Sequence, residues 1–158
     1  MPSKFSVVLA VFVLLAGCSD TGFLGRKTTD IVSEKKPEEP KLVGSSATGG
    51  NCAKSPAHHV EVETKNEDGR RYIAVSGNVS VPDASYVLDA PNLTETGWGN
   101  YTLRVSSRRT AKKPERGCAA LANYTATVRV PDGGPHESFA LTVVHDGEVV
   151  RRVNVTSR

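Results

Sequence analysis

The chain has 158 residues and a nearly balanced charge, with 20 Lys and Arg against 17 Asp and Glu and a formal net charge of +3. Its 38% hydrophobic and 23% charged residues are typical of a globular domain rather than of a wholly disordered chain. The balance excludes a strongly basic nucleic-acid-binding module, and no RNA-recognition, zinc-finger or helix-turn-helix pattern is present.

The beginning of the chain is organised like a secretory signal peptide. Lys4 supplies a positive start, residues 5–16 form an apolar segment, and two small residues precede Cys18. The sequence LAGC at residues 15–18 resembles the lipobox of prokaryotic lipoproteins. The resemblance implies that residues 1–17 are removed as a lipoprotein signal peptide and that Cys18 is lipidated. It also implies a location at the cell membrane, lipid-anchored and facing the extracytoplasmic side.

Two other interpretations of this segment stay open: an ordinary cleaved signal peptide with an accidental cysteine, and a retained anchor. The apolar run is shorter than the roughly 20 residues that a transmembrane helix needs. One acyl chain alone would hold a protein only marginally, so stable anchoring takes more than one chain or a helper patch. The multiple lipidation that the resemblance implies would meet this requirement.

The segment after the signal peptide has the composition of a tether. Residues 18–51 are therefore interpreted as a lipidated cysteine followed by a flexible linker. Prolines and mixed charges fill residues 35–41, and Gly and Ser dominate residues 44–50. Such a composition cannot bury enough apolar surface to offset the entropy lost on ordering.

The remaining residues, 52–158, suit one small domain. If Cys18 carries lipid, Cys52 and Cys118 remain as a pair in an oxidising compartment, which predicts a disulfide bond. Closing that loop would contribute about 4 kcal/mol in the chain-entropy model. Metal binding by this pair lacks the short cysteine spacing of a zinc site.

Apolar and polar residues alternate with a period of two along most of this domain, and no window predicts an amphipathic helix. Gly- and Pro-containing turn signals separate the alternating segments, and Asp146-Gly147 indicates a tight hairpin. The pattern predicts an all-β, antiparallel β-sandwich of about seven strands. It resembles the immunoglobulin-like sandwiches common on cell surfaces, without their Cys–Trp–Cys order, because Trp98 lies in a Gly-flanked turn. The expected strands cover residues 60–63, 72–81, 100–108, 123–130, 139–145 and 148–155.

Five sequons make the domain a candidate for N-glycosylation. Four of the asparagines fall on the polar phase of an expected strand, and the fifth follows Pro91 in a turn. The alternative is that strand faces rich in Asn and Thr generate the motif automatically, since residues i and i+2 share a face. Together with a lipobox, many sequons fit an archaeal surface protein. The candidate sites are Asn78, Asn92, Asn100, Asn123 and Asn154.

The histidines do not form a recognisable metal site. His58 and His59 are adjacent and would face opposite sides of a strand, while His136 and His145 lie near turns. A blue-copper centre would usually need a methionine, and Met1 is the only one. We therefore predict surface histidines, no bound metal and no cofactor. No catalytic motif is present, so no catalytic residue is predicted.

One run of basic residues could contact an anionic partner, such as lipid headgroups, an acidic envelope polymer or an envelope protein. The alternative is a loop that only aids solubility. The run consists of Arg104, Arg108, Arg109, Lys112, Lys113 and Arg116.

These observations predict a lipid-anchored cell-surface protein that is not an enzyme and serves as a binding or scaffolding module. The first alternative is an extracytoplasmic carrier that binds a metal or a small ligand through its histidines. The second alternative is an enzyme, which no catalytic motif in the sequence supports.

Overall fold

The computed structural model describes residues 38–110, 113, 117–132 and 138–156, all of which belong to one compact unit, Lys35–Arg158. Within these ranges the chain forms eleven strands. No helix long and apolar enough to cross a bilayer occurs among the same residues. The strands are β1 (Lys41–Ala47), β2 (Asn51–Cys52), β3 (His59–Glu67), β4 (Arg70–Val81), β5 (Tyr86–Leu88), β6 (Asn92–Gly97), β7 (Asn100–Val105), β8 (Ser107–Arg109), β9 (Ala120–Val130), β10 (Phe139–His145) and β11 (Glu148–Val155).

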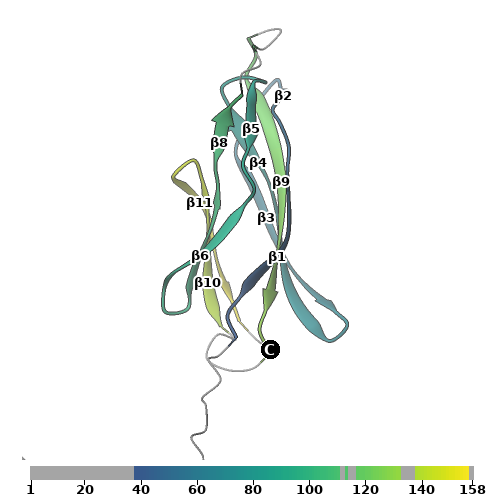
Figure 1. Ribbon diagram of the computed structural model, residues 1–158, viewed down its shortest axis with the longest axis vertical. Helices are drawn as coiled ribbons and strands as arrows, with labels where there is room; N and C mark the ends of the chain where they lie inside the picture. Colours follow the sequence, from purple (N-terminus) through teal and green to yellow (C-terminus); the bar gives the residue numbers. More distant parts are fainter. Residues whose placement is uncertain (1–37, 111–112, 114–116, 133–137, 157–158) are drawn as a thin grey trace, which may run out of the picture. The chain divides into compact units, whose positions relative to one another are not determined.

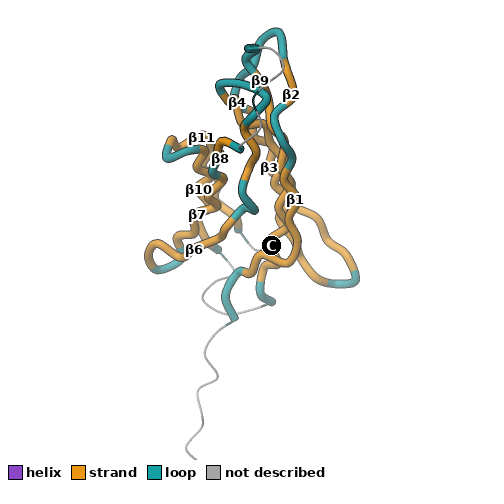
Figure 2. The backbone as a smooth tube through the Cα atoms, turned by 45° about the horizontal axis from the view of Figure 1, so that its top comes forward, coloured by secondary structure: helices purple, strands orange, loops and turns teal. Residues whose placement is uncertain are grey.

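Two sheets face each other, as Figures 1 and 2 show from two directions. The first sheet has the order β1–β9–β4–β3, with β2 also paired to β9, and all its pairs are antiparallel. The second has the order β11–β10–β7–β6, in which β10 is antiparallel to β11 but parallel to β7. A small sheet of β5 and β8 lies near the upper end in Figure 1.

The predicted all-β class with antiparallel sheets in two layers is confirmed. The parallel pair β7–β10 departs from the wholly antiparallel pairing of an immunoglobulin-like sandwich, so that finer likeness is not confirmed. Parallel neighbours need a long crossover connection. Here the chain leaves β7, passes through β8 and through β9 of the opposite sheet, and returns as β10.

The core lies between the sheets and consists of the apolar residues on the inward-facing sides of the long strands. Alternate residues of β4, β7, β9 and β10 are almost completely buried, whereas the apolar residues of the edge strand β3 are only half-buried. The predicted inward faces are therefore confirmed. They comprise Ile73, Val75, Val79, Val81, Tyr101, Leu103, Val105, Tyr124, Ala126, Val128, Val130, Phe139, Leu141 and Val143.

The predicted linker extends too far into the domain. Residues 41–51 were expected to be flexible, but Lys41–Ala47 forms β1 and pairs with β9 over residues 124–129. Ser46 and Thr125 also share a hydrogen bond between their hydroxyl groups (2.8 Å). The Gly- and Ser-rich sequence of β1 carries no strand pattern of its own. The strand forms because β9, which is distant in the sequence, supplies its hydrogen-bond partners.

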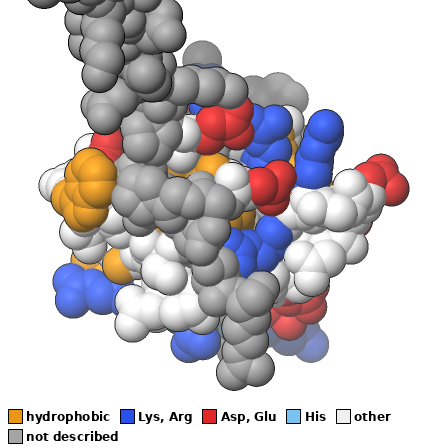
Figure 3. Space-filling view, turned by 90° about the horizontal axis from the view of Figure 1, so that it is seen from below, with side chains coloured by type: hydrophobic (Ala, Val, Ile, Leu, Met, Phe, Trp, Pro, Cys, Tyr) orange, Lys and Arg blue, Asp and Glu red, His pale blue; other side chains and the backbone are white. Residues whose placement is uncertain are grey.

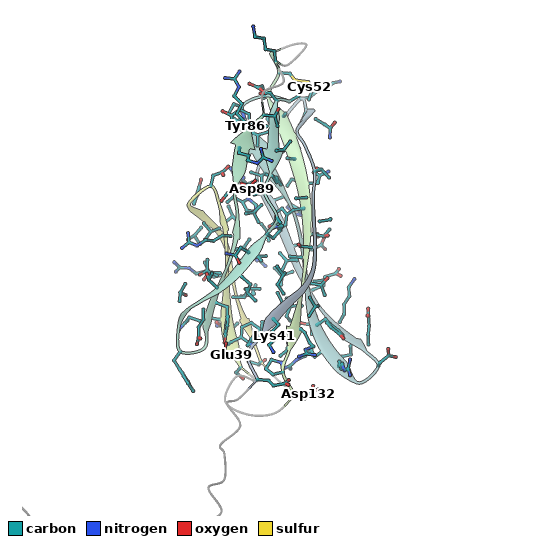
Figure 4. The ribbon with its side chains drawn as sticks, in the orientation of Figure 1. Glu39, Lys41, Cys52, Tyr86, Asp89 and Asp132 are labelled. Carbon is teal, nitrogen blue, oxygen red and sulfur yellow. A yellow bond between two sulfur atoms is a disulfide. The ribbon has the colours of Figure 1, made fainter. Side chains whose placement is uncertain are left out.

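The predicted disulfide between Cys52 and Cys118 is present, with a Cα–Cα distance of 5.6 Å. It lies at the upper end in Figure 4, where Cys52 is labelled. Strand β2 pairs with the beginning of β9, and the N–H of Ala53 donates to the carbonyl oxygen of Ala119 (3.0 Å). The disulfide therefore ties the end of β2 to the segment that leads into β9, an inner strand of the first sheet.

Candidate functional site

A chain of hydrogen bonds connects the two sheets through Tyr124, His145 and His58. Tyr124 Oη lies 2.8 Å from His145 Nε2, and His145 Nδ1 lies 3.2 Å from His58 Nδ1. Tyr124 belongs to β9 of the first sheet, His145 ends β10 of the second, and His58 directly precedes β3. Tyr124 and His145 are 2% and 1% exposed, while His58 is exposed. This chain of hydrogen bonds therefore runs from the core to the surface.

Tyr124 occupies this position because its direct partner on β4 is a glycine. A Cβ atom at Gly77 would lie 2.8 Å from both Oη and Cε1 of Tyr124. It would also lie 2.6 Å from the carbonyl oxygen of His59. These distances are too short for non-bonded atoms, so the missing side chain of Gly77 is what lets the Tyr124 ring lie flat over β4.

One arrangement of protons gives a partner to each buried side-chain nitrogen and oxygen of this hydrogen-bond chain, those of Tyr124 and His145. The backbone N–H of Ser80 donates to His58 Nδ1 (3.4 Å), so this nitrogen acts as an acceptor. His145 Nδ1–H shares the single lone pair of this nitrogen with the Ser80 N–H, which leaves His145 Nε2 as the acceptor for the Tyr124 hydroxyl. His145 and Tyr124 are neutral in this arrangement.

Burial keeps the inner groups neutral. It lowers the pKa of His145 from 6.5 to about 4, assisted by the neighbouring His58, while the Asp146 carboxylate acts in the opposite direction. Burial also raises the pKa of Tyr124 above its ordinary value of 10. A neutral, fully bonded chain of this kind joins the sheets and specifies how they pack. Both ring nitrogens of His145 are engaged, so neither is available to a metal ion.

The prediction of surface histidines is wrong for His145. His145 lies on the same inward-facing side of β10 as Phe139, Leu141 and Val143, because alternate residues of a strand share a face. This alternation was the signal in the sequence that could have placed His145 in the core. His59 is exposed at the start of β3, and His136 lies outside the described residues. In the described part of the chain, no group of three or more His, Cys, Asp or Glu is placed to hold a metal ion.

A second feature is an open groove of about 420 Å³ at one end of the second sheet. Trp98, at the tip of the β6–β7 hairpin, lines it and is 73% exposed. This hairpin is at the lower left in Figure 1. The expected placement of Trp98 in a turn is therefore confirmed. The other lining residues are Gly99, Asn100, Ser138, Phe139, Ala140, Asn154, Val155 and Thr156.

The sequon asparagines all lie on outer faces of the sheets. Asn78 is half-buried and the other four are exposed. Asn78 and Asn123 are direct cross-strand partners on the first sheet. Their Cβ atoms would be about 5 Å apart, so two glycans there would crowd each other. Asn92, Asn100 and Asn154 lie on the second sheet, and glycosylation at all five sites stays a prediction.

The basic run does not form one continuous patch in the described residues. Arg104 is exposed on β7, whereas Arg108 and Arg109 are neighbours on β8 and face opposite sides. Arg108 Nε forms an ion pair with Asp89 Oδ1 (2.7 Å), and Arg109 Nε donates to Ser85 Oγ (3.3 Å). Asp89 is labelled in the upper part of Figure 4, below Tyr86.

Two further residues of the run, Lys112 and Arg116, lie outside the described residues, and Lys113 is exposed. The opposite end of the domain carries interspersed basic and acidic side chains on its visible surface (Figure 3). An anionic partner for the basic run therefore stays a prediction.

Together these features define an all-β, disulfide-bonded domain with a buried polar link between its sheets and an open groove at one end. The predicted lipidation site, Cys18, and the signal peptide lie outside the described residues. Comparison of the chain with protein-family models, with curated proteins and with solved structures finds no match.

Proposed function

We propose that this chain is a lipid-anchored, extracytoplasmic protein whose β domain is a non-catalytic binding or scaffolding module. The observation that carries the anchoring is the LAGC sequence that ends at Cys18. The disulfide between Cys52 and Cys118 supports it, because such bonds persist in oxidising compartments outside the cytoplasm. Two of the three cysteines are thereby used, and Cys18 is the one left for lipid.

The position of β1 shortens the proposed tether. Residues 19–40 separate Cys18 from the first strand, and fully extended they would span at most about 80 Å. The domain would therefore stay close to the membrane surface. An anionic polymer, lipid headgroup or envelope protein within this reach is the proposed partner of Arg104 and the neighbouring basic residues.

The groove beside Trp98 favours a binding role. A large aromatic side chain that is mostly exposed beside a concave surface is common where proteins recognise ligands. The carrier alternative is weaker, since His145 uses both ring nitrogens within the core and His58 Nδ1 is also engaged.

The intact mass of the native protein, extracted from its own membrane, tests the anchoring. We expect the mass of the Cys18–Arg158 peptide plus lipid increments, with added hexose-type increments if the sequons are used. The matched variant Cys18→Ser should lose the lipid increments and leave the membrane fraction. A native mass equal to the unmodified peptide would rule out the anchor.

A further inference from the structure

We propose that the free edge of β3 pairs with the β3 edge of a second copy of this chain, which joins the first sheets of two domains into an antiparallel dimer. The inference rests on the proposed function, because a lipid anchor confines the chains to one membrane and raises their local concentration. The two main sheets have four edge strands, β1 and β3 in the first and β6 and β11 in the second. Of these four, β3 has the most regular edge.

Three of the four edge strands are interrupted by an extra residue. The register shifts leave Val43 of β1, Thr96 of β6 and Val150 of β11 without a direct partner on the neighbouring strand. Such β-bulges bend a strand and hinder its pairing with another chain. Strand β3 instead keeps nine consecutive pairs with β4 without a shift, and it contains no proline. Its edge is therefore the one that suits a further strand.

The turn of the β3–β4 hairpin determines which backbone groups of β3 are free. Asp68 and Gly69 form a two-residue turn with φ values of 51° and 72°, so the flanking pair Glu67–Arg70 exchanges hydrogen bonds. Alternation from this pair directs the N–H and C=O groups of the even-numbered residues 60–66 away from β4. No strand or side chain in the described part of the molecule bonds to these groups. Seven of the nine residues of β3 are exposed, and the turn end of the hairpin is at the lower right in Figure 1.

The charges of β3 complement those of a second, antiparallel copy. With residue 63 of each copy on the symmetry axis, Glu61 lies opposite the partner's Lys65, and this pair occurs twice. On the inner face, Val62 lies opposite the partner's Thr64, which brings β-branched side chains together. Only Glu63 faces its own copy. A shift by two residues in either direction places two pairs of glutamates opposite each other, so the register centred on residue 63 is favoured.

This register also satisfies the free backbone groups. The even-numbered residues 60–66 of the two copies would exchange about eight hydrogen bonds. The contact uses the same surface on both copies, so it closes after two chains. None of the five sequon asparagines belongs to β3. The nearest, Asn78, lies on the outer face of β4, so a glycan there would extend from the face and not from the edge.

An antiparallel pair remains compatible with two anchors in one membrane. The longest strand, β4, has 12 residues and spans about 40 Å. Each tether spans up to about 80 Å, so both tethers reach the membrane when the pair lies along its surface. A contact of this size is weak, and we expect a Kd near about 0.1 mM. The protein should therefore be monomeric in dilute solution and dimeric where anchoring concentrates it.

Cysteine crosslinking in the native membrane tests the contact and its register. In Glu63→Cys the two new thiols lie opposite each other at a non-hydrogen-bonded pair, with Cα atoms about 4.5 Å apart, which a disulfide can bridge. Glu61→Cys and Lys65→Cys are the matched controls, because they change the same exposed face two residues away. Each should crosslink at least about tenfold less than Glu63→Cys when expressed alone, and well when the two are expressed together. Equal yields from all three single variants, or no crosslinked dimer, would overturn the proposal.

Charge variants of the full mature protein give an independent test. Sedimentation equilibrium in a density-matched detergent, up to about 0.5 mM protein, measures the Kd. Lys65→Glu should weaken the dimer at least about fivefold, because it places glutamates opposite each other twice. Adding Glu61→Lys to it should restore the Kd to within about twofold, and Glu63→Gln alone should tighten the dimer. A double variant as weak as Lys65→Glu, with unchanged thermal unfolding, would contradict the pairing.

The outcomes also separate this inference from the proposed anchoring. Absence of lipid on Cys18 with the expected Kd in solution would reject only the anchor, whereas lipid on Cys18 without self-association would reject only this inference. Crosslinking of Glu63→Cys to other membrane proteins alone would indicate a foreign strand at the edge and would overturn pairing between copies of this chain.

Discussion

At the level of single residues, the buried His145 couples the stability of the domain to pH. In the unfolded chain this histidine takes up a proton near pH 6.5, whereas in the folded domain its pKa is lowered to about 4. Between these values the unfolded state binds the proton and the folded state does not. Stability is therefore greatest above pH 6.5 and falls as the pH is lowered toward 4. The groups that face His145 are His58, Tyr124 and Asp146.

We expect this residue alone to account for a loss of roughly 2–4 kcal/mol across that range. The free energy of unfolding in urea, measured from about pH 7 to about pH 4 for the natural protein and for His145→Gln, gives the comparison. The variant should start less stable and show a correspondingly shallower fall. Parallel pH profiles for the two proteins would mean that His145 titrates alike in both states.

The same residue shows why the polar link was missed from the sequence. A histidine beside a turn is usually exposed, and this general tendency led to the prediction of a surface residue. The alternation of apolar residues in the sequence indicated that His145 faces inward from β10. Its partners Tyr124 and His58, however, lie 21 and 87 residues away in the sequence. Such a contact depends on which sheet faces which, and local alternation carries no information about that.

At the level of elements, alternation predicted the long strands that have an apolar face, and it failed for strands that are very short or mostly polar. Strands β4, β9, β10 and β11 lie where the pattern placed them, and the expected strand 100–108 is divided into β7 and β8 at Ser106. The sequence analysis did not predict strands β1, β2, β5 and β6. β6 has Leu93 as its one large apolar residue, and it is ordered by its hairpin with β7. Edge strands of this kind obtain their hydrogen bonds from a neighbour.

Strand β1 gives an element-scale prediction. A chain that begins at Thr48 lacks β1 and leaves the outer edge of β9 unpaired there, whereas a chain that begins at Glu38 keeps it. Losing several ladder hydrogen bonds and the packing of Leu42 should cost roughly 2–5 kcal/mol. The exposed edge of β9 should also promote self-association.

Urea unfolding and size-exclusion chromatography of both shortened chains provide the measurement. The chain that begins at Glu38 is the control and should match the full mature protein. If the chain that begins at Thr48 were equally stable and equally monomeric, β1 would contribute nothing to the sheet.

At the level of the whole molecule, the disulfide constrains the unfolded chain more than it adds contacts. Cys52 and Cys118 are 66 residues apart, and closing so long a loop stabilises the folded state by about 4 kcal/mol in the chain-entropy model. Cys52→Ser and Cys118→Ser should therefore each cost a similar amount, and the double variant should cost no more than either one. Chemical unfolding of the three variants under non-reducing conditions measures this. Additive losses would show that the two cysteines act separately.

The sequence by itself determined the all-β class, the inward faces of the long strands, the hairpin at Asp146-Gly147 and the disulfide, since each depends on local periodicity, turn chemistry or a count of cysteines. The tertiary structure decided the pairing of β1 with β9, the parallel neighbours β7 and β10, the burial of His145 and the groove beside Trp98. These features arise where segments far apart in the chain meet. Their free energy comes from partners that no short window of sequence contains.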